Sequence, residues 1–327
     1  MMIVRCVFAL TSRTARGTRR RVLYTWLPTL ILAVLLTQAA CRATSPDPKP
    51  PVAPAPTVSA VDEEPEPPAV DCGEAIEGAD EVLRPGGLVM LGEMHGTRQI
   101  PAFTADLVCL GAARGLPVRL GVELPLGEQA AIDTYLAAPA TPATPADRDA
   151  LLSSDLWTRP DQDGRSSEAM LALIERVRTL RQAGLDVTLF SFDIENRGDW
   201  NARDARMAAL ILERASAEPQ ALVITLSGNV HNRITPGLPW SADAVPMGVI
   251  VHRARPDAIS LDARYQEGTA WVCLSGTGCG VARLRGSTDS PERRLVMQTE
   301  PDANGYHGTF SVGAIEAAPP AVAPSPS

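Results

Sequence analysis

Four ionisable side chains follow short apolar runs in this chain of 327 residues, namely Glu93, His95, Glu123 and His231. A carboxylate beside an imidazole raises the pKa of the imidazole and orients its ring, which suits the histidine to take a proton from water or a hydroxyl. Carboxylates and imidazoles can equally hold a divalent transition metal with open coordination positions, and Glu93, His95 and His231 are then the candidate ligands. The spacing leaves both possibilities open.

The apolar runs before these residues have the length and composition of buried β-strands. They cover residues 87–91, 118–122, 187–192 and 221–226, and segments with apolar residues three and four apart lie between them. Alternating strands and helices predict parallel strands joined by right-handed crossovers. Ligands of such sheets bind beyond the carboxyl ends of the strands. We therefore expect the four side chains, together with Asn229, at one edge of the sheet.

The pattern changes after residue 246. Four short apolar runs, at 249–251, 258–261, 271–274 and 281–284, are separated by short connections and predict strands. Such strands would finish the sheet in antiparallel or mixed fashion. The predicted fold is thus α/β, with a mainly parallel sheet flanked by helices and antiparallel or mixed strands toward the C-terminus.

Residues 138–165 interrupt this pattern with a proline-rich stretch. A loop of this length in a compact domain is usually a lid or a disordered insertion, and both remain open. Arg165, at the end of this segment, is a candidate to cover a bound substrate. Arg98 is a candidate to bind an anionic group, and Asn229 is the third candidate for substrate binding.

The first 40 residues form a segment apart. They contain six arginines and no acidic residue, and the apolar run 22–40 stops at Cys41. This is the pattern of a signal sequence, with a retained membrane anchor as the alternative because the run is barely long enough to span a bilayer. Residues 36–41 resemble a bacterial lipobox, which implies lipidation of Cys41. We expect an exported protein that a lipid anchors to the bacterial cell envelope, at the outer membrane.

Proline-rich segments flank the expected domain. Residues 41–70 comprise the lipidated cysteine and a linker with nine prolines, a composition that stays extended. Residues 316–327 have a similar composition and are predicted to be a disordered tail. Residues 71–315 remain for a single α/β domain, which is long enough for one substantial core.

Four of the six cysteines fall in this domain, which allows three pairings. We favour Cys72 with Cys109 and Cys273 with Cys279; four buried free thiols are the alternative.

The charge of the chain disfavours two kinds of partner, nucleic acid and anionic lipid. Removal of the first 40 residues takes away six arginines, which leaves 24 basic and 38 acidic residues and a net charge of −14. A surface of this sign repels nucleic acid and anionic lipid headgroups. Membrane attachment is therefore expected through the lipid anchor and not through surface charge.

Four motifs, in this order along the chain, resemble the signatures of one superfamily. They are Gly92-Glu93-Met94-His95-Gly96-Thr97-Arg98, Gly121-Val122-Glu123, Arg203-Asp204-Ala205-Arg206-Met207-Ala208 and Gly228-Asn229-Val230-His231. The superfamily joins ChaN-like haem-binding lipoproteins, erythromycin-esterase-type hydrolases and Tiki-type metalloproteases. The resemblance implies that His95 is the general base, that Glu93 and Glu123 orient or charge the site, and that His231 is a second imidazole.

Three functions are compatible with these features. The first is a lipid-anchored envelope hydrolase in which the His/Glu site activates water, with or without a metal, against an ester or amide. The second is a non-catalytic lipoprotein of the ChaN-like type that binds haem or another cofactor. In the third, the site is degenerate and the protein binds a partner. A small molecule or haem is the expected ligand of the first two.

Overall fold

The computed structural model describes residues 70–140, 142–194, 198–274 and 278–323, all within the compact unit 63–327. The predicted signal sequence, Cys41 and all but the last residue of the predicted linker lie outside the described residues. In the part of the chain that is described, no helix is long and apolar enough to cross a membrane.

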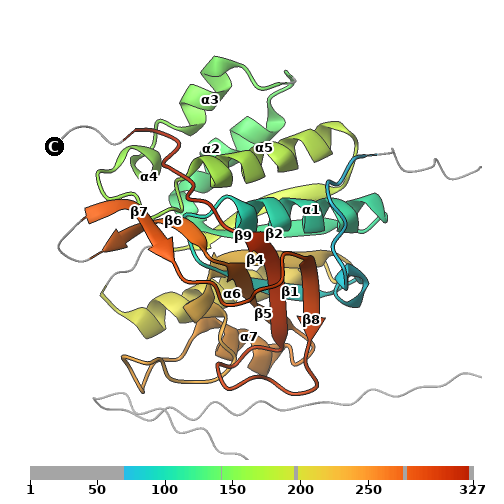
Figure 1. Cartoon of the computed structure of the whole chain (residues 1–327). Helices are drawn as coiled ribbons and strands as arrows, with labels where there is room; N and C mark the ends of the chain where they lie inside the picture. Colours follow the sequence, from blue (N-terminus) through green and yellow to red (C-terminus); the bar gives the residue numbers. More distant parts are fainter. Residues whose placement is uncertain (1–69, 141, 195–197, 275–277, 324–327) are drawn as a thin grey trace, which may run out of the picture. The chain divides into compact units, whose positions relative to one another are not determined.

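A seven-stranded sheet organises the domain, with the strand order β3-β2-β4-β1-β5-β9-β8 (Figure 1). Its strands are β1 (Leu88–Glu93), β2 (Val118–Pro125), β3 (Val187–Asp193), β4 (Leu222–Gly228), β5 (Ile259–Gln266), β8 (Arg293–Met297) and β9 (Gly308–Ala314). All neighbours pair in parallel except β8, which is antiparallel to β9. Strands β6 (Gly268–Leu274) and β7 (Gly278–Leu284) form a separate antiparallel hairpin. The predicted α/β fold class is confirmed.

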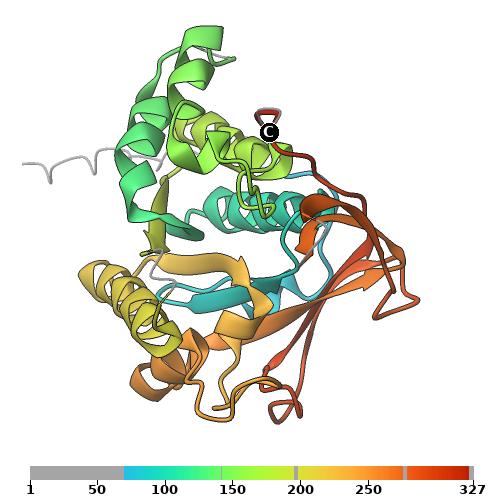
Figure 2. The same cartoon turned by 90° about the vertical axis from the view of Figure 1, so that its left-hand side faces the viewer.

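Helices cover both faces of the sheet (Figure 2). They are α1 (Gln99–Ala113), α2 (Gln129–Ala137), α3 (Pro145–Leu151), α4 (Asp155–Thr158), α5 (Glu168–Gln182), α6 (Trp200–Ala217) and α7 (Met247–Ala254). Successive side chains of a strand point to opposite faces. Val89 and Leu91 accordingly join the core under α1, α2 and α5, whereas Leu88 and Met90 join the core under α6 and α7. A parallel sheet buried on both faces explains why its strands read as continuous apolar runs.

Helix α7 corrects one sequence expectation. The run 249–251 was expected to be a strand, but it lies inside α7, which follows Pro246. Its apolar residues Met247 and Val251 are four apart, so they share the helix face that packs against the second core. A short apolar run fits a buried strand and a buried helix equally well, which is why periodicity alone gave the wrong element.

The C-terminal residues correct a second expectation. Residues 316–323 were expected to belong to a disordered tail, but residues 315–323 pack across the domain, and we call them the C-terminal strap. Ala318 is fully buried and donates its N–H to the carbonyl of Gly96, 2.9 Å away. Ala321 donates to the carbonyl of Ser166, also at 2.9 Å. An alanine- and proline-rich strap forms no helix or strand here; it is held because its backbone groups pair with two loops.

The insertion 138–165 is folded where the structure describes it. It contains α3 and α4, and Trp157 is fully buried in the core. The fully buried Arg178 of α5 donates to the carbonyl of Ala138, 3.0 Å away, and fixes the start of the insertion. The disordered alternative is therefore wrong for these residues.

The described residues contain two disulfides, and they are the pairs favoured from the sequence. Cys72 is joined to Cys109 of α1, which attaches the start of the domain to that helix. Cys273 is joined to Cys279 across the β6–β7 hairpin.

Candidate functional site

The carboxyl ends of four parallel strands bring the candidate residues together. Glu93 ends β1, Glu123 lies near the end of β2, and His231 follows β4 in a short 3-10 helix (Asn229–Asn232). Asp193 ends β3 and joins the same cluster. Because β4 lies between β1 and β2, and β2 lies beside β3, the residues become neighbours at one edge of the sheet.

His95 is the accessible member of the cluster. Its Nδ1 lies 2.8 Å from Oε1 of Glu93, and its Nε2 lies 3.6 Å from Oε2 of Glu123. The His95 side chain is 24% exposed, against 2% for Glu93 and 4% for Glu123. At 3.6 Å the second contact is too long for a hydrogen bond. Nothing in the described chain hydrogen-bonds to Nε2 of His95, so this nitrogen is available to a water or a substrate.

The two carboxylates determine the charge of His95. Burial by itself lowers the pKa of the imidazole, but Glu93 and Glu123 outweigh burial and raise the pKa of His95 to about 9. His95 is therefore mostly imidazolium at neutral pH, and its neutral form becomes abundant only in alkaline solution.

Glu123 is the central anion of the cluster. Its Oε1 accepts from Nη2 of Arg203 at 2.7 Å, and its Oε2 accepts the backbone N–H of Gly228 at 2.7 Å. Arg165 adds a second guanidinium, with Nη1 3.6 Å from Oε1. Burial raises the pKa of a carboxyl, but the imidazolium of His95 and the guanidinium groups of Arg165 and Arg203 outweigh it and hold the pKa of Glu123 well below its usual range.

Asp193 holds both arginines in place. It is fully buried; its Oδ1 accepts from Nε of Arg203 at 2.8 Å and its Oδ2 from Nη1 of Arg165 at 2.7 Å. Arg165 is also paired with Asp163 at 2.7 Å. The structure thus places Arg165 in the cluster, with its guanidinium bound to carboxylates of the chain.

His231 is enclosed by its neighbours. Its Nδ1 lies 2.9 Å from Asp204, its Nε2 lies 3.1 Å from Nη1 of Arg203, and its ring stacks on Trp200. Arginine only donates, so Nε2 accepts and the ring proton sits on Nδ1. Both nitrogens are occupied, and His231 supports the site without being open to water.

Asp204 does not cap helix α6, whose N-cap is Asp199; it is fully buried and its carboxylate lies against Nδ1 of His231. The sequence feature that could have identified Arg203 and Asp204 as members of the cluster is their motif, which lies at the start of a helix that faces the edge of the sheet.

Two predicted substrate-binding residues do not join the cluster. The exposed Arg98 pairs with Glu168, 3.1 Å away, on the surface. Asn229 donates from Nδ2 to Oδ1 of Asp262 on β5, 3.1 Å away. Arg98 and Asn229 are close in sequence to His95 and His231, which belong to the cluster. The chain turns between the two members of each pair, so the side chains of Arg98 and Asn229 contact other residues.

The cofactor alternatives fit the residues less well. Among the residues with described positions, no group of three or more His, Cys, Asp and Glu is arranged to hold a metal ion. The suggested set of Glu93, His95 and His231 is not assembled, because both nitrogens of His231 are engaged. An imidazole that binds haem iron needs an open nitrogen, and a cofactor pocket has mostly apolar walls. In the cluster, as far as its residues are described, the open imidazole nitrogen is Nε2 of His95, and it faces the carboxylate of Glu123.

Gly228 leaves room beside the open nitrogen of His95. A Cβ at this position would lie 3.1 Å from Nε2 of His95 and 3.5 Å from Oε2 of Glu123. Its backbone, with φ −51° and ψ 133°, is one that any residue adopts. We therefore expect Gly228→Ala to fold and to lower any activity of His95 by about tenfold through crowding alone. Gly127→Ala, where an added Cβ meets nothing, is the control, and equal loss in both variants would contradict the role of Gly228.

Comparison with solved structures finds relatives of this fold. A mutant erythromycin esterase in its open conformation aligns with a TM-score of 0.53 at 11% identity, over 72% of this chain and 92% of that chain. A protein from Bacillus cereus aligns with a TM-score of 0.50 at 12% identity, over 74% and 92%. The haem-binding ChaN of Campylobacter jejuni aligns with a TM-score of only 0.35 at 10% identity, over 71% of this chain and 89% of that chain. A structural likeness this weak supports no conclusion about this chain.

At these identities the likeness shows the fold alone, and that fold agrees with the superfamily resemblance of the motifs. The sequence itself matches no protein-family model and no curated protein.

Proposed function

We propose that this chain is an exported, lipid-anchored hydrolase in which His95 activates water for attack on an ester or amide. One observation carries the proposal. His95 is a partly exposed imidazole with Nδ1 held by Glu93 and with Nε2 open, inside a cluster whose other charged groups are paired. That is the arrangement a general base needs, because one nitrogen is oriented and the other can accept a proton.

The reaction follows from these contacts. Neutral His95 takes a proton from water on Nε2 while its Nδ1–H donates to Glu93. The water oxygen forms a bond to the carbonyl carbon, and the resulting imidazolium is stabilised by Glu93 and Glu123. The bond from carbon to the leaving oxygen or nitrogen then breaks, and the proton returns from Nε2 to the leaving group. The products are an acid and an alcohol or amine.

A panel of p-nitrophenyl esters and aminoacyl p-nitroanilides tests this function on the purified domain. We expect at least one compound of the panel to be hydrolysed with saturation kinetics, and the loss of this hydrolysis in His95→Gln. Arg98→Ala is the matched control, since Arg98 lies on the surface beside Glu168. Hydrolysis that survives in His95→Gln, or a panel without any turnover, would count against a hydrolase.

The pH dependence gives a separate prediction. The pKa of His95 is raised to about 9, so the neutral base is about one molecule in a hundred at pH 7. We expect kcat/KM to rise about tenfold per pH unit below this pKa and to level off above it. Glu93→Gln removes one of the carboxylates that raise the pKa, so its profile is expected to reach the plateau at lower pH. A rate that falls above the pKa would instead make protonated His95 the general acid.

Anchoring is proposed from Cys41, which lies outside the described residues. We expect cells that express the full chain to incorporate labelled palmitate into it, and Cys41→Ser to abolish the label and release the protein from the membrane fraction. Cys6→Ser is the control, since Cys6 lies inside the signal sequence. A Cys41→Ser protein that stays labelled would refute the lipid anchor.

A further inference from the structure

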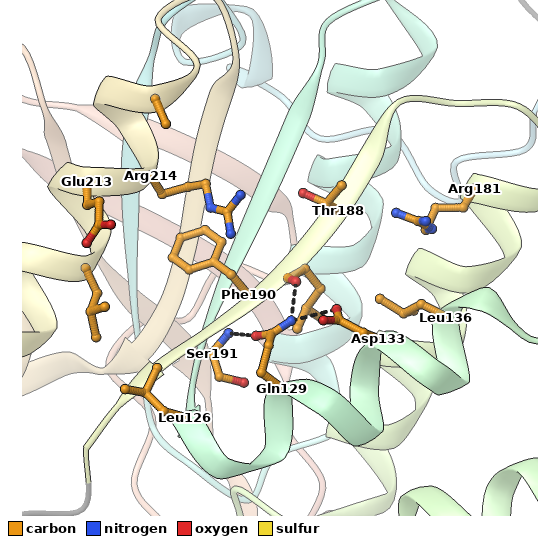
Figure 3. A pocket seen from close by; sticks show the side chains of 13 residues that line it. Leu126, Gln129, Asp133, Leu136, Arg181, Thr188, Phe190, Ser191, Glu213 and Arg214 are labelled. Carbon is orange, nitrogen blue, oxygen red and sulfur yellow. Dashed lines mark hydrogen bonds between the residues drawn. The ribbon is translucent and has the colours of Figure 1, made fainter.

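Strand β3 is an edge of the sheet, and a side-chain amide already occupies its open side. Among the described strands only β2 pairs with it. Gln129 of α2 accepts the N–H of Ser191 on its Oε1 at 2.6 Å and donates from Nε2 to the carbonyl of Leu189 at 3.1 Å. Figure 3 shows Gln129 reaching toward the strand. The amide thus takes the position that a peptide group of an added strand would occupy.

A pocket of about 640 Å³ lies along this edge (Figure 3). One flank is formed by Asp133, Leu136 and Arg181 of α2 and α5. The other flank is formed by Leu210, Glu213 and Arg214 of α6. Each flank combines one cation, one carboxylate and one apolar side chain. A ligand with a strong net charge of either sign therefore gains little, whereas an extended chain with alternating side chains meets similar surroundings on both sides.

Two hydroxyl groups in this pocket lack partners. Oγ1 of Thr188 and Oγ of Ser191 are buried atoms without a hydrogen bond to any described residue, and both residues line the pocket. Ser191 as a whole is only 4% exposed. A buried hydroxyl without a partner is unfavourable, and such groups in native proteins usually have a partner that is not seen. The pocket thus offers polar groups to a ligand that can donate and accept hydrogen bonds.

We propose that the β3 edge binds the main chain of an extended peptide, which displaces the amide of Gln129 and pairs with Leu189 and Ser191. A peptide supplies the alternating donors and acceptors that this edge lacks, and strand addition is an established way for sheet edges to bind peptides. The proposal goes beyond hydrolysis and does not depend on it, because the edge contains none of the residues of the His95 site.

The edge also leads toward that site. Leu126 lines this pocket and a second one that includes Asp193. Asp193 is the carboxylate that binds Arg165 and Arg203. A peptide that continues past Ser191 would therefore run toward the His95 site.

A fluorescein-labelled pentapeptide of alternating threonine and valine is the probe, and the same peptide with methylated main-chain nitrogens is its matched control. Fluorescence anisotropy with His95→Gln protein measures binding without any cleavage. We expect the methylated peptide to bind about tenfold more weakly. We expect Gln129→Ala to bind the unmodified peptide about fivefold more tightly, because the competing amide is gone. Gln220→Ala, outside the pocket, should leave the binding unchanged.

If Gln129→Ala does not fold, amide NMR spectra of the protein without substitutions in the pocket test the proposal instead. The N–H signals of Leu189 and Ser191 should shift on addition of the unmodified peptide and not on addition of the methylated one. Equal binding of the two peptides, or unshifted signals at both positions up to millimolar peptide, would overturn the proposal.

Discussion

Replacement of His95 by glutamine is expected to lower kcat/KM by about 10²- to 10⁴-fold, the range that a positioned general base contributes. Glutamine has a similar reach and can still donate to Glu93, but it cannot take a proton from water. The fold should survive the substitution, since the His95 side chain is partly exposed and its only hydrogen bond among the described residues is to Glu93, although stability falls because the positive charge beside two buried carboxylates is lost. The measurement is steady-state hydrolysis of whichever compound of the ester and amide panel the wild-type domain turns over.

Two comparisons make this result specific. The circular-dichroism spectrum of His95→Gln should match that of the wild type and its melting curve should stay cooperative, at a lower temperature because the positive charge beside two buried carboxylates is lost; a folded signal at the assay temperature separates lost chemistry from lost folding. His252→Gln is a matched histidine variant, because His252 lies on α7 and contacts His307, not the His95 cluster. Comparable losses of activity in the two variants would show that His95 has no special part in the reaction.

The position of the site could be predicted from the sequence because it depends on the period and length of apolar runs. The runs that end near Glu93 and Glu123 are buried on both faces, and parallel strands carry the following residues to one edge. His95 and His231 arrive there for the same reason. Neighbouring residues were harder to predict. Arg98 and Asn229 turn away to Glu168 and Asp262, which depends on tertiary contacts that spacing does not contain.

The parts that the sequence did not reveal depend on contacts between distant segments. Asp193 binds Arg165 and Arg203, which come from the insertion and from α6. The C-terminal strap holds the carbonyl of Gly96, the residue after His95, although its alanine- and proline-rich composition predicts disorder. The composition of a segment predicts the structure that the segment forms in isolation. It does not predict a backbone hydrogen bond to a loop that is distant in the sequence.

The C-terminal strap and the β6–β7 hairpin both donate a hydrogen bond to Gly96. Gly96 has a φ of +78°, and its carbonyl accepts both from Ala318 and from Trp271 of that hairpin, at 2.9 Å and 2.8 Å. A Cβ on Gly96 would lie 2.0 Å from the carbonyl oxygen of Trp271, so only glycine permits this approach. The residue after the proposed base is thus fixed by two segments far away in the sequence.

Glu123→Gln is expected to destabilise the domain by about 3–5 kcal/mol, the usual cost of removing one partner from a buried ion pair. Both oxygens of Glu123 accept hydrogen bonds, one from Arg203 and one from the N–H of Gly228. A glutamine must turn its NH₂ toward one of these donors, and it leaves the buried guanidinium groups with less negative charge. The measurement is the free energy of unfolding from urea titrations at pH 7. Glu168→Gln removes an exposed carboxylate that pairs with Arg98, and this control should change stability by less than about 1 kcal/mol.

The pH dependence of this difference provides its strictest test. The pKa of Glu123 is lowered in the folded state, from 4.5, so its stabilising contribution is complete above that value and is lost as the pH falls. The gap between wild type and Glu123→Gln should stay constant from pH 7 to about 5 and then shrink by about 1.4 kcal/mol per pH unit. Glu168→Gln should show no such trend. A gap that does not change with acidification would mean that the charge of Glu123 contributes nothing, and that the effect of the substitution comes from packing alone.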